Sequence, residues 1–199
     1  MQKNREFRSL LSLEEYNLLI GKFSDSKSDV QTNHYYDTPR FSLKAQEMFL
    51  KIKEREGSLE LSFKYKKNYQ HLEIVLPISY DELNEINKTG VISYPEIISE
   101  LSSIIKEQKL VNFLSLSTTR NYFSYANGSV FLDQNCFCFP TVINDGEIAK
   151  VIDYEIEYEA KNYDDGITEF ISLIKEYNLS YKKTDKKIKR AFNTYKLIH

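Results

Sequence analysis

The chain has 199 residues, 28% of them charged, and a formal net charge of −2 at pH 7. This length suffices to bury a sizeable core, and we expect one domain spanning residues 1–199. The nearly balanced charge gives no bulk electrostatic reason to expect a nucleic-acid or membrane partner. The sequence also lacks a run of eighteen apolar residues, and its charged first ten residues do not resemble a signal peptide.

Alternating apolar positions, capping signals and turn residues predict the secondary structure in chain order. We expect a strand at 3–10, a helix at 13–23, strands at 31–37, 48–54 and 58–66, an extended piece at 70–76, and helices at 80–87 and 96–107. Strands at 110–116, 119–125, 129–137 and 149–160 follow, then helices at 167–176 and from 185 onward. About eight strands with four or five helices among them indicate an α+β fold.

Two of these helices start with a recognisable capping signal. Ser12 with Glu15, and Ser79 with Glu82, form the Ser-x-x-Glu pattern of a capping box, in which each side chain satisfies a backbone N–H at the helix start.

Segment 151–160 carries the strongest chemical pattern in the chain. Asp153, Glu155, Glu157 and Glu159 occupy every second position, with apolar residues between them. Because side chains alternate across a strand, the four carboxylates would share one face. Like charges on one face repel, so we expect a metal ion or a row of Lys and Arg side chains opposite them. An acidic, half-exposed surface strand is the alternative interpretation.

Other predicted strands supply cations at alternating positions. Their polar positions are Asn4, Glu6 and Arg8 around Phe7, Lys51 and Lys53 around Ile52, Glu60, Ser62 and Lys64 around Phe63, then Arg120 and Asp133. Each strand taken alone is compatible with a solvated face of an open sheet. Together they favour a barrel or cupped sheet with a polar lumen and helices over its apolar exterior.

Cys136 and Cys138 are the only cysteines, and His34, His71 and His199 show no metal-ligand spacing around them. Two thiols do not form a structural zinc site. We interpret both cysteines as free thiols in a reducing cytoplasm.

Several motifs occur in a fixed order along the chain. They are Asn4-Arg5-Glu6-Phe7-Arg8, His34-Tyr35-Tyr36-Asp37-Thr38-Pro39, Leu50-Lys51-Ile52-Lys53, Glu60-Leu61-Ser62-Phe63-Lys64, Thr118-Thr119-Arg120, Leu132-Asp133, the carboxylates of 153–159 and Lys187-Ile188-Lys189-Arg190. In this order and spacing the chain resembles the CYTH superfamily, the triphosphate tunnel enzymes, and most closely their small bacterial YjbK-like branch.

The resemblance implies a closed eight-stranded antiparallel β-barrel whose tunnel binds a triphosphate and whose glutamates hold Mg²⁺ or Mn²⁺. Members of this family hydrolyse inorganic tripolyphosphate, thiamine triphosphate or nucleoside triphosphates, and some cyclise ATP. We therefore expect a triphosphatase whose partner is a small-molecule triphosphate or polyphosphate, with tripolyphosphate as the first substrate to test. A homodimer remains open, since the oligomeric state is not readable from the sequence.

The resemblance also assigns roles to individual residues. The expected phosphate-binding cations are Arg8, Lys51, Lys53, Lys64, Arg120, Lys187 and Arg190. The expected metal ligands are Glu6, Glu155 and Glu157, with Asp133 or Glu159 as helpers, and the expected catalytic residues are Glu157, Arg120 and Lys64. These residue types suit the chemistry, because Lys and Arg neutralise phosphate oxygens and hard cations prefer carboxylate oxygens.

Some positions depart from the family pattern. Asn4 stands where the family has its first glutamate, so a neutral amide replaces one anionic metal ligand. Arg8 replaces the opening lysine, and Lys51 and Lys53 replace arginines, which loses the bidentate grip on phosphate. The cation count is preserved while the metal site is weakened.

Less specific interpretations stay open. Glu6, Glu155 and Glu157 are also compatible with simple ion pairs to neighbouring Lys and Arg. Lys182, Lys183 and Lys186 are expected on a solvated face, while Lys187 and Arg190 suit either a surface or a phosphate contact. His34 and His71 are expected to be packed strand residues, Asp37 a turn residue, and the tyrosines 35, 36, 154 and 158 barrel exterior under helices. An adenylate cyclase and a non-catalytic polyphosphate or nucleotide binder are the alternative functions.

Overall fold

The structure is a computed structural model that describes residues 6–23 and 27–198. The chain divides into two compact units. The first unit comprises Met1–Val30, Thr118–Cys136 and Val151–His199, and the second comprises Gln31–Ser117 and Phe137–Lys150. The expected metal ligand position Asn4 lies outside the described residues.

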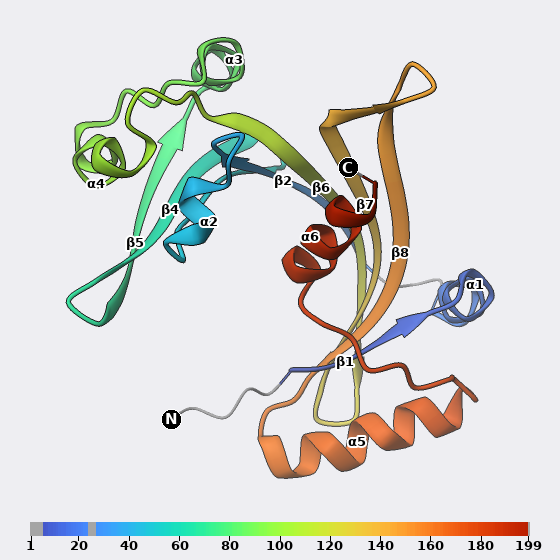
Figure 1. The fold of residues 1–199 in the computed structure, drawn as a ribbon. Coiled ribbons are helices and arrows are strands. Elements are labelled where there is room, and N and C mark those ends of the chain that lie inside the picture. Colours follow the sequence, from blue (N-terminus) through green and yellow to red (C-terminus); the bar gives the residue numbers. More distant parts are fainter. Residues whose placement is uncertain (1–5, 24–26, 199) are drawn as a thin grey trace. The chain divides into compact units, whose positions relative to one another are not determined.

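Eight strands and six helices make up the described chain, as Figure 1 shows. The elements are β1 (Glu6–Leu11), α1 (Leu13–Lys22), β2 (Lys27–Asp37), α2 (Ser42–Ala45), β3 (Phe49–Arg55), β4 (Ser58–Lys67), β5 (Gln70–Ile78), α3 (Tyr80–Thr89), α4 (Pro95–Ile105), β6 (Val111–Tyr125), β7 (Gly128–Asn144), β8 (Glu147–Glu159), α5 (Tyr163–Glu176) and α6 (Lys187–Ile198).

The strands form one sheet in the order β1-β8-β7-β6-β2-β3-β4-β5. The pairs β1/β8, β2/β3, β3/β4 and β4/β5 are antiparallel. A closed barrel requires the first and last strands of this order to pair. Among the described strands β1 and β5 are instead the two ends of the order. The α+β prediction and the eight strands of one sheet are confirmed, whereas this strand order does not confirm closure into a barrel.

Most predicted elements are present with small shifts at their ends. The main difference is that the predicted strands at 110–116 and 119–125 are one continuous strand, β6. Ser117 and Thr118 join them without a Gly or Pro that would break the ladder. The short helix α2 was not expected; it follows Asp37, whose buried carboxylate accepts the backbone N–H groups of Thr38, Leu43 and Lys44 at 2.7, 2.9 and 3.0 Å. Asp37 therefore organises a turn, as predicted.

Both predicted capping boxes are confirmed. In α1 the Glu15 backbone N–H donates to Ser12 Oγ at 3.2 Å, and the Glu15 carboxylate accepts the Ser12 N–H at 2.7 Å. Ser79 and Glu82 make the same reciprocal bonds at the start of α3. Each box satisfies backbone donors that a helix start leaves without an intrahelical partner.

The core of the first unit is formed by the apolar face of β8 and by helices α1 and α5. Ile156 and Tyr158 are fully buried there together with Leu19 of α1 and Leu173 of α5. Phe7 of β1 shares this face, because it pairs with Tyr158 across the two strands. The expectation that Phe7 and Ile156 pack under helices is therefore confirmed.

The core of the second unit is built in the same way, from the strand positions that alternate with the lysines of β3 and β4. Ile52 and Phe63 are fully buried, and helices α3 and α4 contribute Ile86, Ile97 and other side chains to the same cluster. Figure 1 shows these two helices in green within this unit. The packing predicted for Ile52 and Phe63 is confirmed as well.

One part of the tyrosine prediction is wrong. Tyr36 is buried and donates to Asn87 of α3 at 2.7 Å, as expected for a side chain under helices. Tyr35 is its neighbour in the strand and points to the other face, where it pairs with Lys51. Burial raises the pKa of Tyr35 to about 12.

No helix in residues 6–23 or 27–198 is both long and apolar enough to cross a membrane. Cys136 and Cys138 are partly buried, and neither forms a disulfide within the described residues.

Candidate functional site

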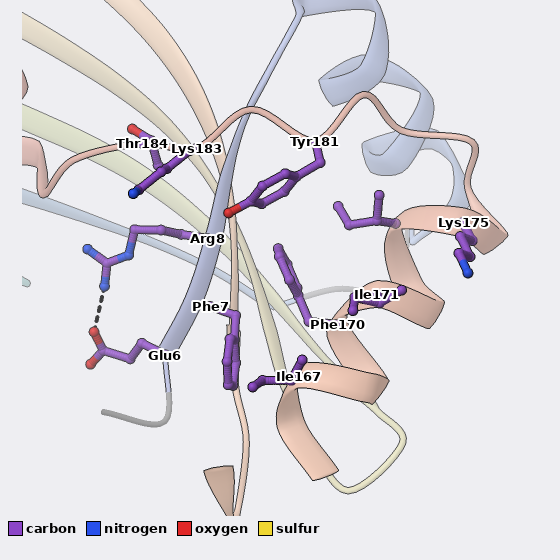
Figure 2. Close-up of a pocket in the computed structure, with 11 residues that line it drawn as sticks. Glu6, Phe7, Arg8, Ile167, Phe170, Ile171, Lys175, Tyr181, Lys183 and Thr184 are labelled. Atoms are coloured by element: carbon purple, nitrogen blue, oxygen red, sulfur yellow. Dashed lines mark hydrogen bonds and ion pairs between the residues drawn. The ribbon is translucent and has the colours of Figure 1, made fainter. Parts of the chain in front are cut away.

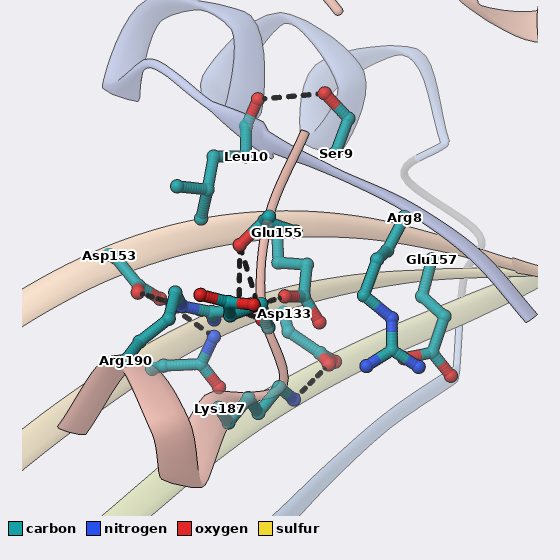
Figure 3. Close-up of polar contacts among 12 residues, drawn as sticks. Arg8, Ser9, Leu10, Asp133, Asp153, Glu155, Glu157, Lys187 and Arg190 are labelled. Atoms are coloured by element: carbon teal, nitrogen blue, oxygen red, sulfur yellow. Dashed lines mark hydrogen bonds and ion pairs between the residues drawn. The ribbon is translucent and has the colours of Figure 1, made fainter. Parts of the chain in front are cut away.

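The carboxylates of β8 and the one cation of β1, Arg8, share one face of the first unit. In the antiparallel pair Glu6 lies opposite Glu159, Arg8 opposite Glu157, and Leu10 opposite Glu155. Directly opposed residues point to the same side of a sheet, so this charged face is the reverse of the apolar face that α1 and α5 cover. Figure 3 shows its side chains.

The first contact group centres on Asp133 of β7, whose side chain is fully buried. Arg120 of β6 donates to both of its oxygens, from Nε at 2.7 Å and from Nη2 at 2.6 Å. Lys187 of α6 donates to the same carboxylate. Although burial opposes its ionisation, these two cations hold the pKa of Asp133 below its ordinary value.

The second contact group centres on Arg190, which lies three residues after Lys187 and on the same side of α6. Arg190 donates to Asp153 from Nε at 2.8 Å and to the buried Glu155 from Nη1 at 2.5 Å. Cations in the first turn of a helix are disfavoured by the helix dipole. The carboxylates of β7 and β8 therefore stabilise this start of α6.

The third contact group links β1 with β8. Arg8 donates to Glu6 at 2.6 Å and lies 3.5 Å from a Glu157 oxygen, while Arg120 lies 3.9 Å from the other. The two distances to Glu157 are longer than a typical charged hydrogen bond. Glu157 therefore has two cations near it, and neither is in close contact. Burial, only partly offset by Arg120 and Arg8, raises the pKa of Glu157.

The charge balance of this face is slightly acidic. The three groups contain five carboxylates and four cations, namely Glu6, Asp133, Asp153, Glu155 and Glu157 against Arg8, Arg120, Lys187 and Arg190. One oxygen of Glu155, Oε1, is buried without a hydrogen-bond partner. A buried carboxylate oxygen without a donor is unfavourable, and it suits a hard cation.

The carboxylate oxygens of this face are the type of ligand that a divalent ion prefers, but they are not already arranged around a common point. In the part of the chain that the structure describes, no three His, Cys, Asp or Glu side chains already form a metal-binding group. Arginine and lysine side chains hold the carboxylates apart from one another in this arrangement.

The second unit has a separate basic face on β3 and β4. Lys51 pairs with Ser62, Lys53 with Glu60, and Lys64 of β4 with Glu73 of β5. Lys64 is half-exposed and lies 3.2 Å from the Glu73 carboxylate, which also accepts a 2.6 Å hydrogen bond from Ser62. Burial and the neighbouring charge of Lys64 lower the pKa of Lys51.

The sequence pattern of the CYTH domain matches residues 2–192 of the chain. This chain belongs to the CYTH family. YjbK of Bacillus subtilis, provisionally named a triphosphatase, is 27% identical over 192 residues, which cover 94% of this chain and 93% of YjbK.

Two solved CYTH-like structures are similar over nearly the whole length. A Bacillus halodurans protein, provisionally described as an adenylate cyclase, is 26% identical with a TM-score of 0.63, covering 95% of this chain and 97% of its own. HpAC1 from Hippeastrum, described as an adenylyl cyclase with a dominant triphosphatase activity, is 17% identical with a TM-score of 0.61, covering 96% and 94%. The second likeness shows the fold alone.

The geometry brings together many of the residues expected from the CYTH motifs. Within the first unit these are Glu6, Arg8, Arg120, Asp133, Glu155, Glu157, Lys187 and Arg190. Within the second unit, Lys51, Lys53 and Lys64 share one face. Glu159 is exposed at the end of β8, and no described cation forms an ion pair with it.

Glu6 and Glu155 form ion pairs with Arg8 and Arg190, as one of the interpretations of the sequence expected. Lys182, Lys183 and Lys186 are exposed, as predicted, whereas Lys187 and Arg190 are mostly buried in ion pairs.

Sequence reasoning left out a polar chain that supports this face. Thr118 donates to Asn135 at 2.8 Å, and Asn135 donates to Asp153 at 2.9 Å, which fixes the carboxylate that Arg190 binds. Asp153 belonged to the acidic alternation, but no family motif assigned it a role. The sequence did contain one indication of this contact: Asn135 lies two residues after Asp133 on the same strand, so both side chains point to the same face.

Proposed function

We propose that this CYTH protein is a divalent-metal-dependent hydrolase of triphosphate compounds, with inorganic tripolyphosphate as its first substrate. The observation that carries the proposal is the charged face of the first unit, where five carboxylates face four cations and one buried Glu155 oxygen has no donor. The name of the Bacillus subtilis relative, a triphosphatase by provisional assignment, supports the same activity. We also expect a cytoplasmic location, a single functional CYTH domain and the closed tunnel implied by the family.

We assign the metal ligands to Glu155 and Glu157, with Glu6 beside them and Asp133 or Glu159 as helpers. Bound there, Mg²⁺ or Mn²⁺ would offset the carboxylate excess and supply Lewis-acid chemistry at a phosphoryl oxygen. Arg8 and Arg190 now neutralise Glu6 and Glu155. Ion binding would therefore release guanidinium groups that can turn to phosphate oxygens.

The cations are assigned to substrate binding. Arg120 is held in place by both oxygens of Asp133 and keeps its charge, so it can present its remaining N–H to a phosphate oxygen in a fixed orientation. We assign the same role to Arg8, Lys187 and Arg190, and to Lys51, Lys53 and Lys64 on the basic face. We assign Glu157 its catalytic role as a metal ligand, for which its carboxyl group must be ionised.

A phosphate-release screen tests the proposal. Purified protein is incubated with tripolyphosphate, ATP or thiamine triphosphate, each with Mg²⁺, with Mn²⁺ and with chelator. We expect metal-dependent release from tripolyphosphate and a loss of this release in Glu157→Gln, because a neutral amide replaces one proposed anionic ligand of the required metal. Glu147→Gln is the matched control, since Glu147 is exposed at the start of the same strand.

Tight tripolyphosphate binding without phosphate release under any metal condition would contradict the enzyme assignment and establish the binder. The departure at Asn4 has its own test. Asn4→Glu adds a carboxylate, so we expect the metal titration to shift to lower concentration while triphosphate affinity changes less. An unchanged metal dependence would mean that Asn4 does not serve the metal.

Adenylate cyclisation is the second candidate, supported by the description of the Bacillus halodurans relative. The same incubations with ATP distinguish the two reactions. Hydrolysis gives inorganic phosphate, and cyclisation gives pyrophosphate with a cyclic nucleotide. We expect phosphate as the main product.

A further inference from the structure

The first unit contains a cavity of about 600 Å³ whose apolar walls lie outside the charged face. It lies between β1, α5 and the segment 181–184 that leads toward α6, as Figure 2 shows. Its walls are apolar, formed by Phe7, Phe170 and Tyr181 and by three isoleucines of α5, Ile167, Ile171 and Ile174. A volume of this size falls within the range of small-molecule pockets.

The aromatic walls of the cavity are in contact with one another. Phe7 and Phe170 are stacked with ring centroids 6.1 Å apart, and Tyr181 meets Phe170 edge-on at 6.4 Å. The Tyr181 side chain is 61% exposed, and Ile171 is 48% exposed. Phe170 is buried in the core of the first unit and Phe7 packs against that core, so the apolar surface available to a planar ligand is that of Tyr181 and Ile171.

The rim of the cavity is basic. Arg8, Lys175, Lys183 and Thr184 line it, and Figure 2 shows Lys183 and Thr184 beside Arg8 with Lys175 at the other end. Glu6 is the acidic residue of the lining, and Arg8 already binds it. Among the described carboxylates none forms an ion pair with Lys175 or Lys183, so two ammonium charges at the rim are not neutralised.

We propose that this cavity binds a small amphipathic anion, with an aromatic body on the exposed side chains of Tyr181, Ile171 and Ile167 and an anionic group on Lys183 and Thr184. The charge of the rim selects an anion, and the walls select a flat apolar body. The apolar part of the site is distinct from the charged face, because Phe7 points to the opposite side of β1, whereas Glu6 and Arg8 belong to both. The ligand is a free small molecule and is not consumed.

Binding of the fluorescent aromatic sulfonate 1-anilinonaphthalene-8-sulfonate to the purified full chain tests the proposal. We expect saturable binding at one site per chain. Ile171→Glu places a carboxylate against the apolar wall, and Lys183→Glu reverses the charge at the rim. Each should weaken binding by about tenfold or more, equivalent to about 1.4 kcal/mol.

The matched controls carry the same substitutions outside the cavity. Ile152→Glu changes an isoleucine that is 51% exposed on β8, and Lys186→Glu changes an exposed lysine next to the same segment. Neither should alter the affinity. Absence of saturable binding, or equal losses in the controls, would overturn the site.

A pair of ligands separates the two parts of the proposal. 2-Naphthyl phosphate and neutral 2-naphthol share the aromatic body, and each is measured by displacement of the sulfonate probe. We expect the phosphate to bind at least tenfold more tightly in the wild type and to lose this advantage in Lys183→Glu. Equal affinities in the wild type would overturn the anionic part of the assignment.

Discussion

Replacement of Asp133 by asparagine removes the charge at the centre of the charged face while keeping the size of the side chain. The wild-type carboxylate is fully buried and accepts two hydrogen bonds from Arg120 and one from Lys187. The asparagine amide offers one acceptor oxygen and an NH₂ group that faces the guanidinium. Arg120 and Lys187 would then stay charged in a partly buried site without their counterion.

The structure sets the size of the effect. Breaking a buried ion pair by removing one partner costs roughly 3–5 kcal/mol of unfolding free energy. The side chains of Arg120 and Lys187 are 25% and 17% exposed, and Glu157 lies 3.9 Å from Arg120 as a residual partner. Water and Glu157 recover part of the loss, so we expect Asp133→Asn to cost about 3 kcal/mol.

Urea unfolding and thermal melts measure this loss. About 3 kcal/mol corresponds to a melting temperature lower by roughly 6–12 °C in a chain of this length. Asp185→Asn is the matched control, because Asp185 forms an exposed ion pair with Lys189 at 2.9 Å, and we expect about 0.5 kcal/mol. Equal losses in the two variants would refute the argument from burial.

The same variant has a defined pH dependence. Arg120 and Lys187 overcome the effect of burial and lower the pKa of Asp133, so the folded state favours its ionised form. Its contribution is fully present above the pKa of the unfolded chain and is lost as the pH falls through the lower folded pKa. The stability difference between wild type and Asp133→Asn should therefore shrink in acid. A difference that grows on acidification would contradict the assignment.

Three further variants test other parts of the structure by urea unfolding. Burial raises the pKa of Glu157, so its ionisation opposes folding at neutral pH; Glu157→Gln should keep or increase stability, and a clear loss would contradict this sign. Ser12→Ala removes the cap of α1 and should cost about 1 kcal/mol, whereas no loss would deny the capping box a stabilising role. Gly166→Ala should destabilise α5 despite the better helix propensity of alanine, because the new Cβ would lie 2.6 Å from the Phe7 ring and 2.5 Å from the Ala160 Cβ; a more stable variant would show that the neighbours move easily.

Local patterns predicted the elements and the faces well. The alternation in 151–160 places Glu155 and Glu157 on one side and Ile156 and Tyr158 on the other, because a strand has a period of two whatever it packs against. The same reasoning failed for the pair Tyr35 and Tyr36, where adjacent positions were assigned to one side. The prediction was also wrong at β6, where two strands were expected although no Gly or Pro separates them.

The sequence by itself determined which side chains are charged, how they alternate and where the helices begin, because these properties depend on neighbours a few residues away. Only the tertiary structure decided which cation meets which carboxylate. Lys187 binds Asp133 across 54 residues and Arg190 binds Asp153 across 37, through the docking of α6 on β7 and β8. It also decided that β1 and β5 end the described sheet. No local pattern encodes such contacts, since they depend on how distant segments pack and on the loop closure that brings them together.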